Sequence, residues 1–334
     1  MNDVFILAIE SSCDETSVAI VKNGKDVIAM KTNTQISTHE KYGGVVPEVA
    51  SRMHCENIVI VLNETLEEAN MTMTNIDAIA VTYGPGLLGS LLVGVNFAKT
   101  LSIVYKKPLI AVNHLIGHIY ANNIEDKLQF PLITLIVSGG HTQLFYMKRD
   151  YNFELLGETL DDAIGECYDK VAKVLGEKYP GGPNVERLAK DGQEDYNFSV
   201  PMNDDTYNFS YSGLKSNVLN FINTRKMRNE EIDKASVAYS FQKTAVKEVC
   251  NKVEKALKEH EALQLVVAGG VSANNYLREE LQKICDVYKV KLAIPSLKYC
   301  TDNAAMIGAA AYPKYLNKEF ANIDLDAESG LNIC

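Results

Sequence analysis

The sequence lacks several patterns that would place a protein in a large class at once. Its seven cysteines are odd in number and scattered, and no two of them form a Cys-x-x-Cys pair. This arrangement argues against a disulfide framework or a zinc ribbon and indicates reduced thiols in a cytosolic protein. No Gly-x-x-x-x-Gly-Lys-Ser/Thr motif is present, so the chain is not a P-loop enzyme.

Long apolar runs and basic charge are also scarce. No stretch approaches the roughly 20 apolar residues that a membrane helix needs. The first apolar run, Val4–Ile9, is short and ends in Glu10, which is typical of a buried strand and not of a signal peptide. The net charge is −10, so any contact with RNA needs a local basic patch or a partner. We expect a cytoplasmic protein without a membrane segment.

What the chain contains is an alternation of strand and helix patterns. Its 334 residues fit two domains, and 46% hydrophobic with 23% charged residues is ordinary for a globular protein. The alternation predicts an α/β architecture. The predicted strands are Phe5–Ile9, Val18–Val21, Ile76–Val81, Ile110–Val112, Leu132–Val137, Gln143–Met147 and Leu265–Ala268, and the predicted helices are residues 48–70 and Leu87–Val104.

The opening pattern of strand, polar turn with a threonine, and return strand occurs again between Leu132 and Met147. This repetition predicts two similar lobes that face each other. We assign residues 1–129 and a C-terminal helix within residues 303–334 to the first lobe. Residues 130–302 form the second lobe, with a polar surface insertion at about residues 191–213.

Two histidines, His114 and His118, stand four residues apart. If this segment is helical, both imidazoles lie on one face and can converge on a metal ion. The corresponding protease motif has a glutamate general base directly after the first histidine, and here that position is Leu115. A third ligand is required, and spacing alone does not choose it. Ordinary packing of the two rings remains the alternative.

Glycine pairs follow two of the predicted strands, in Ser138-Gly139-Gly140 and in Gly269-Gly270. Glycine lets a ligand approach the backbone, and successive amides can bind an anion at a strand end. A tight turn is the alternative at each position. Two such turns favour a phosphate-bearing ligand.

A third glycine motif, residues 84–89, matches Gly-x-Gly-x-x-Gly between a predicted strand and a helix. No acidic residue follows at a suitable strand end, and Pro85 stiffens the turn. We therefore interpret this motif as helix packing and not as a dinucleotide site.

Taken in order, these motifs resemble the universal family of tRNA threonylcarbamoyladenosine transferases, which belongs to the actin/Hsp70/sugar-kinase superfamily. The resemblance runs nearly end to end, and its details are similar to the bacterial branch. The motifs that carry it are Ile9–Thr16, Tyr42–Glu48, Gly84–Gly86, His114–His118, Ser138–Thr142, Asp161–Lys170, Tyr179–Pro183, Phe209–Lys215, Ala268–Asn274 and Cys300–Asn303.

The resemblance implies two actin/Hsp70-like lobes with mixed sheets flanked by helices, and a metal in the cleft between them. It makes Asp302 the third metal ligand beside His114 and His118. Two imidazoles and a carboxylate suit Fe²⁺ or Zn²⁺. Read without the resemblance, Thr301-Asp302 before an alanine-rich helix is typical of an N-cap, and both interpretations can hold together.

The resemblance also implies the residues that bind the substrate. Those lining the acyl and phosphate part are Ile136, Val137, Ser138, Gly139 and Gly140. Those holding the nucleoside end of an adenylate are Asp169, Gly182, Glu186 and Asn274, although the family often has Asp at the position of Glu186.

Several acidic and basic residues have two interpretations. We hypothesise that Asp14 and Glu15 position charge or water in catalysis, and a solvated acidic turn is the alternative. For Asp169 the alternative is a surface ion pair with Lys170 or Lys173. Lys215 either reaches RNA or phosphate or is an ordinary surface lysine.

The reaction implied is transfer of threonylcarbamoyl from threonylcarbamoyl-adenylate to the exocyclic amine of an adenosine next to the tRNA anticodon. ATP or ADP with Mg²⁺ can also bind in such a site. The expected partners are tRNA, a smaller paralogue of the same fold that packs on the first lobe, and a small P-loop ATPase. The paralogue could dock on the helix in residues 48–70.

Two other functions fit parts of the pattern. A metallopeptidase of the O-sialoglycoprotein endopeptidase type would use the histidine pair, but Leu115 stands where its general base belongs. An ATP-dependent clamp or kinase of the same superfamily would hydrolyse ATP without transfer to tRNA.

Overall fold

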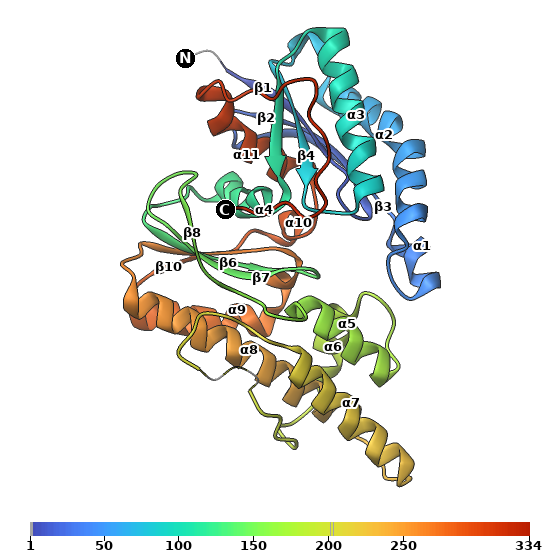
Figure 1. The fold of residues 1–334 in the computed structure, drawn as a ribbon, viewed down its shortest axis with the longest axis vertical. Coiled ribbons are helices and arrows are strands. Elements are labelled where there is room, and N and C mark those ends of the chain that lie inside the picture. Colours follow the sequence, from blue (N-terminus) through green and yellow to red (C-terminus); the bar gives the residue numbers. More distant parts are fainter. Residues whose placement is uncertain (1–2, 201, 203) are drawn as a thin grey trace. The chain divides into compact units, whose positions relative to one another are not determined.

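A computed structural model describes residues 3–200, 202 and 204–334. The chain divides into two compact units (Figure 1). Unit 1 contains residues 3–128 and 295–333, and unit 2 contains residues 129–294 together with Cys334. The second boundary therefore lies at Pro295, earlier than the predicted Asn303. The reason is that residues 295–302 pack on unit 1, where the Asp302 carboxylate contacts His118.

Unit 1 is built on a five-stranded mixed sheet in the order β3-β2-β1-β4-β5. The first three strands are antiparallel, and β4 and β5 continue the sheet parallel to β1. All four strands predicted here are confirmed, whereas β3 was not predicted because most of its residues are exposed or half-buried. The strands are β1 (Phe5–Glu10), β2 (Glu15–Lys22), β3 (Asp26–Thr34), β4 (Ala78–Gly84) and β5 (Leu109–Asn113).

Unit 2 repeats this sheet strand for strand. Its order β10-β9-β6-β7-β8, read from the other edge, has the same antiparallel hairpins and the same parallel additions as unit 1. The predicted duplication and the α/β class with two mixed sheets are confirmed. The strands are β6 (Leu132–Val137), β7 (Thr142–Met147), β8 (Phe153–Glu158), β9 (Gln264–Ala268) and β10 (Lys291–Ala293).

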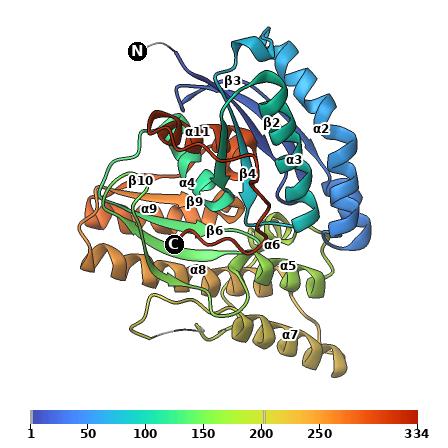
Figure 2. The same ribbon diagram turned by 45° about the horizontal axis from the view of Figure 1, so that its top comes forward.

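Helices cover both faces of the sheet in unit 1 (Figure 2). Alternation along β1 explains this, because Leu7 and Ile9 belong to the core under α2 and α3, while Ala8 faces Gly308 of α11. The predicted helices 48–70 and Leu87–Val104 are confirmed as α2 and α3. The helices are α1 (Ile36–His39), η1 (Glu40–Tyr42), α2 (Pro47–Ala69), η2 (Met73–Asn75), α3 (Leu88–Tyr105), α4 (His114–Glu125), α10 (Leu297–Cys300) and α11 (Ala304–Leu316).

One helix of unit 1 differs from the expectation that no segment is long and apolar enough for a membrane helix. Among the described residues, α3 is long and apolar enough to cross a membrane by length and composition. One of its faces lies in the core of unit 1 through Leu91, Val95 and Ala98, and the helix packs against β4 and α2. A core helix of a globular unit passes the same test. The glycine motif at its start serves packing, since a methyl group at Gly89 would lie 3.2 Å from Ser51 Cβ.

Unit 2 surrounds its sheet with longer helices. Tyr168, Phe241 and Val249 are buried in its core with the strand residues Leu135 and Leu144. The helices are α5 (Ile164–Leu175), α6 (Gly181–Ala189), α7 (Ser212–Met227), α8 (Lys234–Glu259), η3 (Gly270–Ala273) and α9 (Asn275–Tyr288).

The predicted insertion at residues 191–213 lies between α6 and α7, and its described residues form no helix or strand before Ser212. It is not simply a surface loop, because Phe198, Phe209 and Tyr211 are buried in the unit 2 core. The buried Lys252 holds it from α8 by donating to the backbone carbonyl oxygens of Asp204 and Thr206.

Candidate functional site

The helix that carries the histidine pair starts at the first histidine. The Asn113 side chain is its N-cap and accepts hydrogen bonds from the backbone N–H groups of Leu115 and Ile116. Gly117 allows this helix to pack closely on α11, because a methyl group there would lie only 2.7 Å from Ile307 Cδ1. Local sequence thus fixes both the start of α4 and the face that presents His114 and His118.

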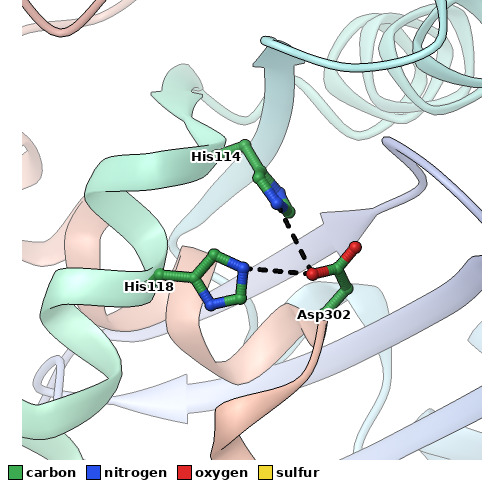
Figure 3. A group of neighbouring side chains, drawn as sticks. All are labelled: His114, His118 and Asp302. Carbon is green, nitrogen blue, oxygen red and sulfur yellow. Dashed lines mark hydrogen bonds and ion pairs between the residues drawn. The ribbon is translucent and has the colours of Figure 1, made fainter. Parts of the chain in front are cut away.

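Both histidines turn toward Asp302 (Figure 3). Nε2 of His118 lies 3.0 Å from Asp302 Oδ1, and Nε2 of His114 lies 3.5 Å from the same oxygen. The ring centroids are 4.7 Å apart and nearly perpendicular, at 84°. One ligand atom from each of the three residues lies within 4.8 Å of the others, which makes the group a possible metal site.

The N-cap interpretation of Asp302 is wrong. Helix α11 begins at Ala304, and its cap is Asn303, whose side chain accepts from the Met306 N–H. Asp302 lies one residue outside that cap. Its carboxylate is therefore free of helix capping and points to the histidines.

The electrostatics of the three residues favour a cation between them. Burial opposes the charged form of Asp302, but the neighbouring His114 and His118 outweigh burial and lower its pKa to about 2. Burial likewise opposes protonation of His114, yet Asp302 and Glu10 raise its pKa to about 9. The field that favours a proton on His114 also favours a divalent ion, so two imidazoles and a carboxylate fit a bound metal.

Sequence reasoning missed a fourth side chain at this centre. Glu10 is fully buried, and its Oε2 lies 3.2 Å from His114 Nδ1. The hydroxyl oxygen of Ser12 lies 3.1 Å from the same nitrogen. The available signal was a charged residue at the end of an otherwise apolar strand, since such residues are seldom buried without a partner.

The acidic turn after β1 lies in the same unit, and of its two carboxyl groups that of Asp14 is buried while that of Glu15 is half-buried. Asp14 is buried, and its Oδ2 has no hydrogen-bond partner among the described residues. Burial raises the pKa of Glu15 to about 10, and the negative charges of Asp302 and Asp14 add to this effect. The alternative of a solvated turn does not agree with the burial of Asp14, whereas the half-buried Glu15 is in partial contact with solvent.

The two glycine turns of unit 2 lie at one edge of its sheet. Strands β6 and β9 are parallel and paired at Ile136 and Ala268, so the turns that follow them are neighbours. A methyl group at Gly269 would lie 2.5 Å from the Val137 carbonyl oxygen, which shows how closely the turns pack. In contrast, a methyl group at Gly139 or at Gly140 would meet nothing within 4 Å, so this backbone is open to a ligand.

The side chains of Ile136 and Val137 do not face a ligand. Both are fully buried in β6, so only their backbone can line a substrate site. Ser138 shapes the turn instead, because its hydroxyl accepts from the His141 N–H at 3.0 Å. Its carbonyl accepts from the Gly165 N–H at the start of α5.

Of the four residues expected at a nucleoside, Gly182 and Asn274 lie at the starts of α6 and α9, whereas Asp169 lies within α5 and Glu186 within α6. The Asp169 carboxylate accepts from the Gly181 N–H at 2.6 Å, and burial raises its pKa. Gly182 is open, since a methyl group there would meet nothing within 4 Å. Asn274 caps α9 by accepting from the Leu277 N–H.

Glu186 reaches the same helix start as Asn274. Its Oε1 accepts from the backbone N–H and the side-chain amide of Asn275, at 2.9 and 2.7 Å. The predicted group is thus brought together as two pairs, Asp169 with the start of α6 and Glu186 with the start of α9.

The alternative for Asp169, an ion pair with Lys170 or Lys173, is not found among the described residues. Lys170 pairs with Glu166 at 2.6 Å and with Asp162 at 3.1 Å. Lys215 also pairs with Asp162, at 2.5 Å. A phosphate would therefore have to compete with this carboxylate for Lys215.

Known proteins are similar to this chain over nearly its whole length. The family model described as tRNA N6-adenosine threonylcarbamoyltransferase matches residues 26–309. Proteins of that name from Staphylococcus aureus strain Mu3 and from the bovine strain RF122 are 52% and 53% identical over 332 residues. Both matches cover 99% of this chain and 97% of the relative.

Solved structures with low identity show the fold. Component A of (R)-2-hydroxyglutaryl-CoA dehydratase from Acidaminococcus fermentans has a TM-score of 0.56 at 14% identity, covering 94% of this chain and 99% of that one. HypF from T. kodakarensis has a TM-score of 0.65 at 15% identity, covering 97% of this chain and 49% of that one. Together with the full-length relatives, the family match establishes that this chain belongs to the tRNA N6-adenosine threonylcarbamoyltransferase family.

Proposed function

We propose that this protein transfers a threonylcarbamoyl group from threonylcarbamoyl-adenylate to the exocyclic amine of an adenosine next to the anticodon of tRNA. In this reaction a bond forms between the amine nitrogen and the carbamoyl carbon, the bond from that carbon to the phosphate oxygen breaks, the amine nitrogen loses one proton, and AMP leaves. The observation that carries the proposal is the convergence of His114, His118 and Asp302, without a glutamate after His114, in a chain of this family.

The metal chemistry follows from the weakness of the nucleophile. The amine of adenine is poorly reactive, so the acyl donor has to be activated. His114, His118 and Asp302 would hold Fe²⁺ or Zn²⁺, which when bound supplies a Lewis acid for the oxygens of the donor. Asp14 lies in the turn that follows Glu10, the last residue of β1. Its buried Oδ2 has no hydrogen-bond partner among the described residues. We assign Asp14 and Glu15 to positioning charge or water near the reacting groups.

Unit 2 supplies the binding residues for the adenylate. The open backbone of Gly139 and Gly140 presents amides to the phosphate or carboxylate of the donor. One oxygen of Asp169 accepts from Gly181, and its other oxygen is left to accept a ribose hydroxyl. An ATP or ADP with Mg²⁺ carries the same nucleoside and phosphate groups and can use the same residues.

The remaining three nucleoside residues act through the backbone or through helix ends. Gly182 lets the nucleoside approach α6, because it has no side chain and the space where a Cβ would stand has no other atom within 4 Å. Glu186 and Asn274 hold the start of α9, so their side chains set the position of the backbone that meets the nucleoside.

Charge and surface favour work in a complex. At a net charge of −10, the chain needs positive surface from companions to hold tRNA. The outer faces of α2 and α3 carry exposed apolar side chains, which suit a smaller paralogue of the same fold. We propose that this paralogue and a small P-loop ATPase are partners and that the complex acts in the cytoplasm. The apolar residues are Val59, Ile60, Ile103, Val104 and Tyr105.

The decisive experiment supplies purified threonylcarbamoyl-adenylate, with threonine labelled, to the protein and its partners together with tRNA bearing the target adenosine. His114→Ala and Asp302→Ala should each reduce label transfer at least about tenfold, because each removes one of three metal ligands. His260→Ala is the matched control, a histidine of unit 2 after the end of α8. Unchanged transfer in both ligand variants contradicts the metal assignment.

The same preparation tests the two other functions. Cleavage of a protein substrate that depends on His118 would favour a metallopeptidase. Leu115 argues against this. It occupies the sequence position of the glutamate general base in the protease motif, and its apolar side chain is buried, with 1% exposed. Stoichiometric ATP hydrolysis without any need for tRNA would favour the clamp or kinase.

A further inference from the structure

We propose that Glu10 is a positioning residue of the metal centre, holding the His114 ring by Nδ1 so that Nε2 is directed to the metal. The proposal rests on the proposed function in one respect only, namely that a metal binds between His114, His118 and Asp302. It adds a residue that acts on a ligand without touching the metal.

The first observation is that Glu10 is a carboxylate with no access to water. It ends β1, and its side chain is 0% exposed. A buried carboxylate is costly unless hydrogen-bond donors surround it. Its surroundings therefore have to explain why a charged residue stands at the end of this strand.

The donors come from three different elements. The Ser12 N–H in the turn after β1 donates to Oε1 at 2.6 Å, and the Thr82 hydroxyl in β4 donates to Oε2 at 2.5 Å. His114 Nδ1, at the start of α4, lies 3.2 Å from the same Oε2. An ionised carboxylate can only accept, so the His114 nitrogen facing it has to carry the hydrogen.

This contact decides which nitrogen of His114 is free. A neutral imidazole carries one ring hydrogen, and if Nδ1 holds it, Nε2 keeps its lone pair. Nε2 is the nitrogen that faces Asp302, at 3.5 Å. A carboxylate that fixes the far nitrogen of a ligating histidine sets both the ring orientation and the hydrogen position, and it strengthens the ligand.

Two neighbours show why the role belongs to Glu10. The Ser12 hydroxyl is also near His114 Nδ1, but a hydroxyl can donate or accept and so does not select a hydrogen position. His118 Nδ1 is buried and has no hydrogen-bond partner among the described residues. His114 is thus the histidine of the pair that has a carboxylate behind it.

The test measures metal binding by the full chain without any transfer reaction. Protein stripped of metal is titrated with Zn²⁺ against a chromophoric chelator and with Co²⁺, whose visible absorption reports the ligand geometry. Glu10→Gln keeps the shape of the side chain and removes its charge. We expect its affinity for both ions to fall about 10- to 100-fold, with an altered Co²⁺ spectrum.

Two further variants separate positioning from loss of stability. Thr65→Val removes a buried hydroxyl of α2 in the same unit, away from His114, and should leave metal affinity unchanged. If Glu10→Gln does not fold, Glu10→Asp takes its place, because its shorter carboxylate keeps the charge but withdraws from Nδ1. We expect at least about tenfold weaker binding for it as well.

The outcomes are distinguishable. Wild-type affinity and spectrum in the Glu10 variant, while His118→Ala loses the metal, overturn the positioning role and leave the metal centre intact. Equal weakening by Thr65→Val overturns it too, because instability alone would then explain the loss. If neither the wild type nor His118→Ala binds metal, the assignment of the metal centre itself is wrong.

Discussion

Raising the pH from 5 to 8 should destabilise unit 2 through one buried carboxyl group, that of Glu248. The side chain is 0% exposed on α8. Burial raises its pKa from the ordinary 4.5 to about 7, although the Ser210 N–H and the charge of Lys252 act in the opposite direction. The folded protein therefore keeps this proton over a pH range in which the unfolded chain has released it.

The sign and size of the effect follow by linkage. With the folded pKa above the unfolded one, the free energy of unfolding falls as the pH rises from about 4.5 to 7 and stays constant above. The whole window corresponds to about 3 kcal/mol, of which about 2 to 3 kcal/mol lies between pH 5 and 8.

The variant Glu248→Gln isolates this contribution. Its amide oxygen can still accept from the Ser210 N–H, which donates to the carboxylate at 2.9 Å. Near pH 5 the wild type and the variant should be similarly stable, and at pH 8 the variant should be more stable by about 2 kcal/mol or more. Urea unfolding followed by circular dichroism from pH 5 to 8 measures the difference, in which other titrating groups cancel.

Glu254→Gln on the same helix is the matched control. Glu254 is half-exposed and paired with Lys258, so its replacement should not reproduce this pH dependence. A difference between wild type and Glu248→Gln that is the same at every pH would refute the reasoning, because the carboxyl group would then titrate alike in both states.

Three further predictions concern packing, capping and thiols. Gly94→Ala should cost unit 1 about 1 to 3 kcal/mol in unfolding free energy, since its methyl group would lie 2.3 Å from Ser11 Oγ, and thermal unfolding measures this loss. Asn113→Ala removes the cap of α4 and should cost about 1 kcal/mol and weaken Zn²⁺ binding, as measured by chelator competition. In the native protein, Cys55 and Cys334 should react rapidly with a thiol reagent because both are exposed, whereas the buried Cys167, Cys285 and Cys300 should react only on unfolding. The packing described would be contradicted if neither variant lowered the stability, or if all thiols reacted at the same rate.

The sequence alone determined the features that depend on short stretches of chain. Apolar runs gave the seven predicted strands because a strand buried on both faces leaves its mark within a few residues. The four-residue spacing of His114 and His118 placed both on one face of α4, since helical geometry is local. The edge strands β3, β8 and β10 escaped prediction because their exposed side chains leave no such pattern.

Only the tertiary structure decided how distant residues meet. Local reading made Asp302 a helix cap, and the fold moved the cap to Asn303 and turned Asp302 to His118, 184 residues away in the chain. Glu10 lies 104 residues from His114, and no spacing rule connects a strand end to a helix start over that distance. Burial gave the pKa of Glu15 its rise, since desolvation depends on what surrounds a side chain and not on its neighbours in sequence. The spacing of the two histidines indicated a metal site and the family resemblance added Asp302, but only the fold showed that the three side chains converge.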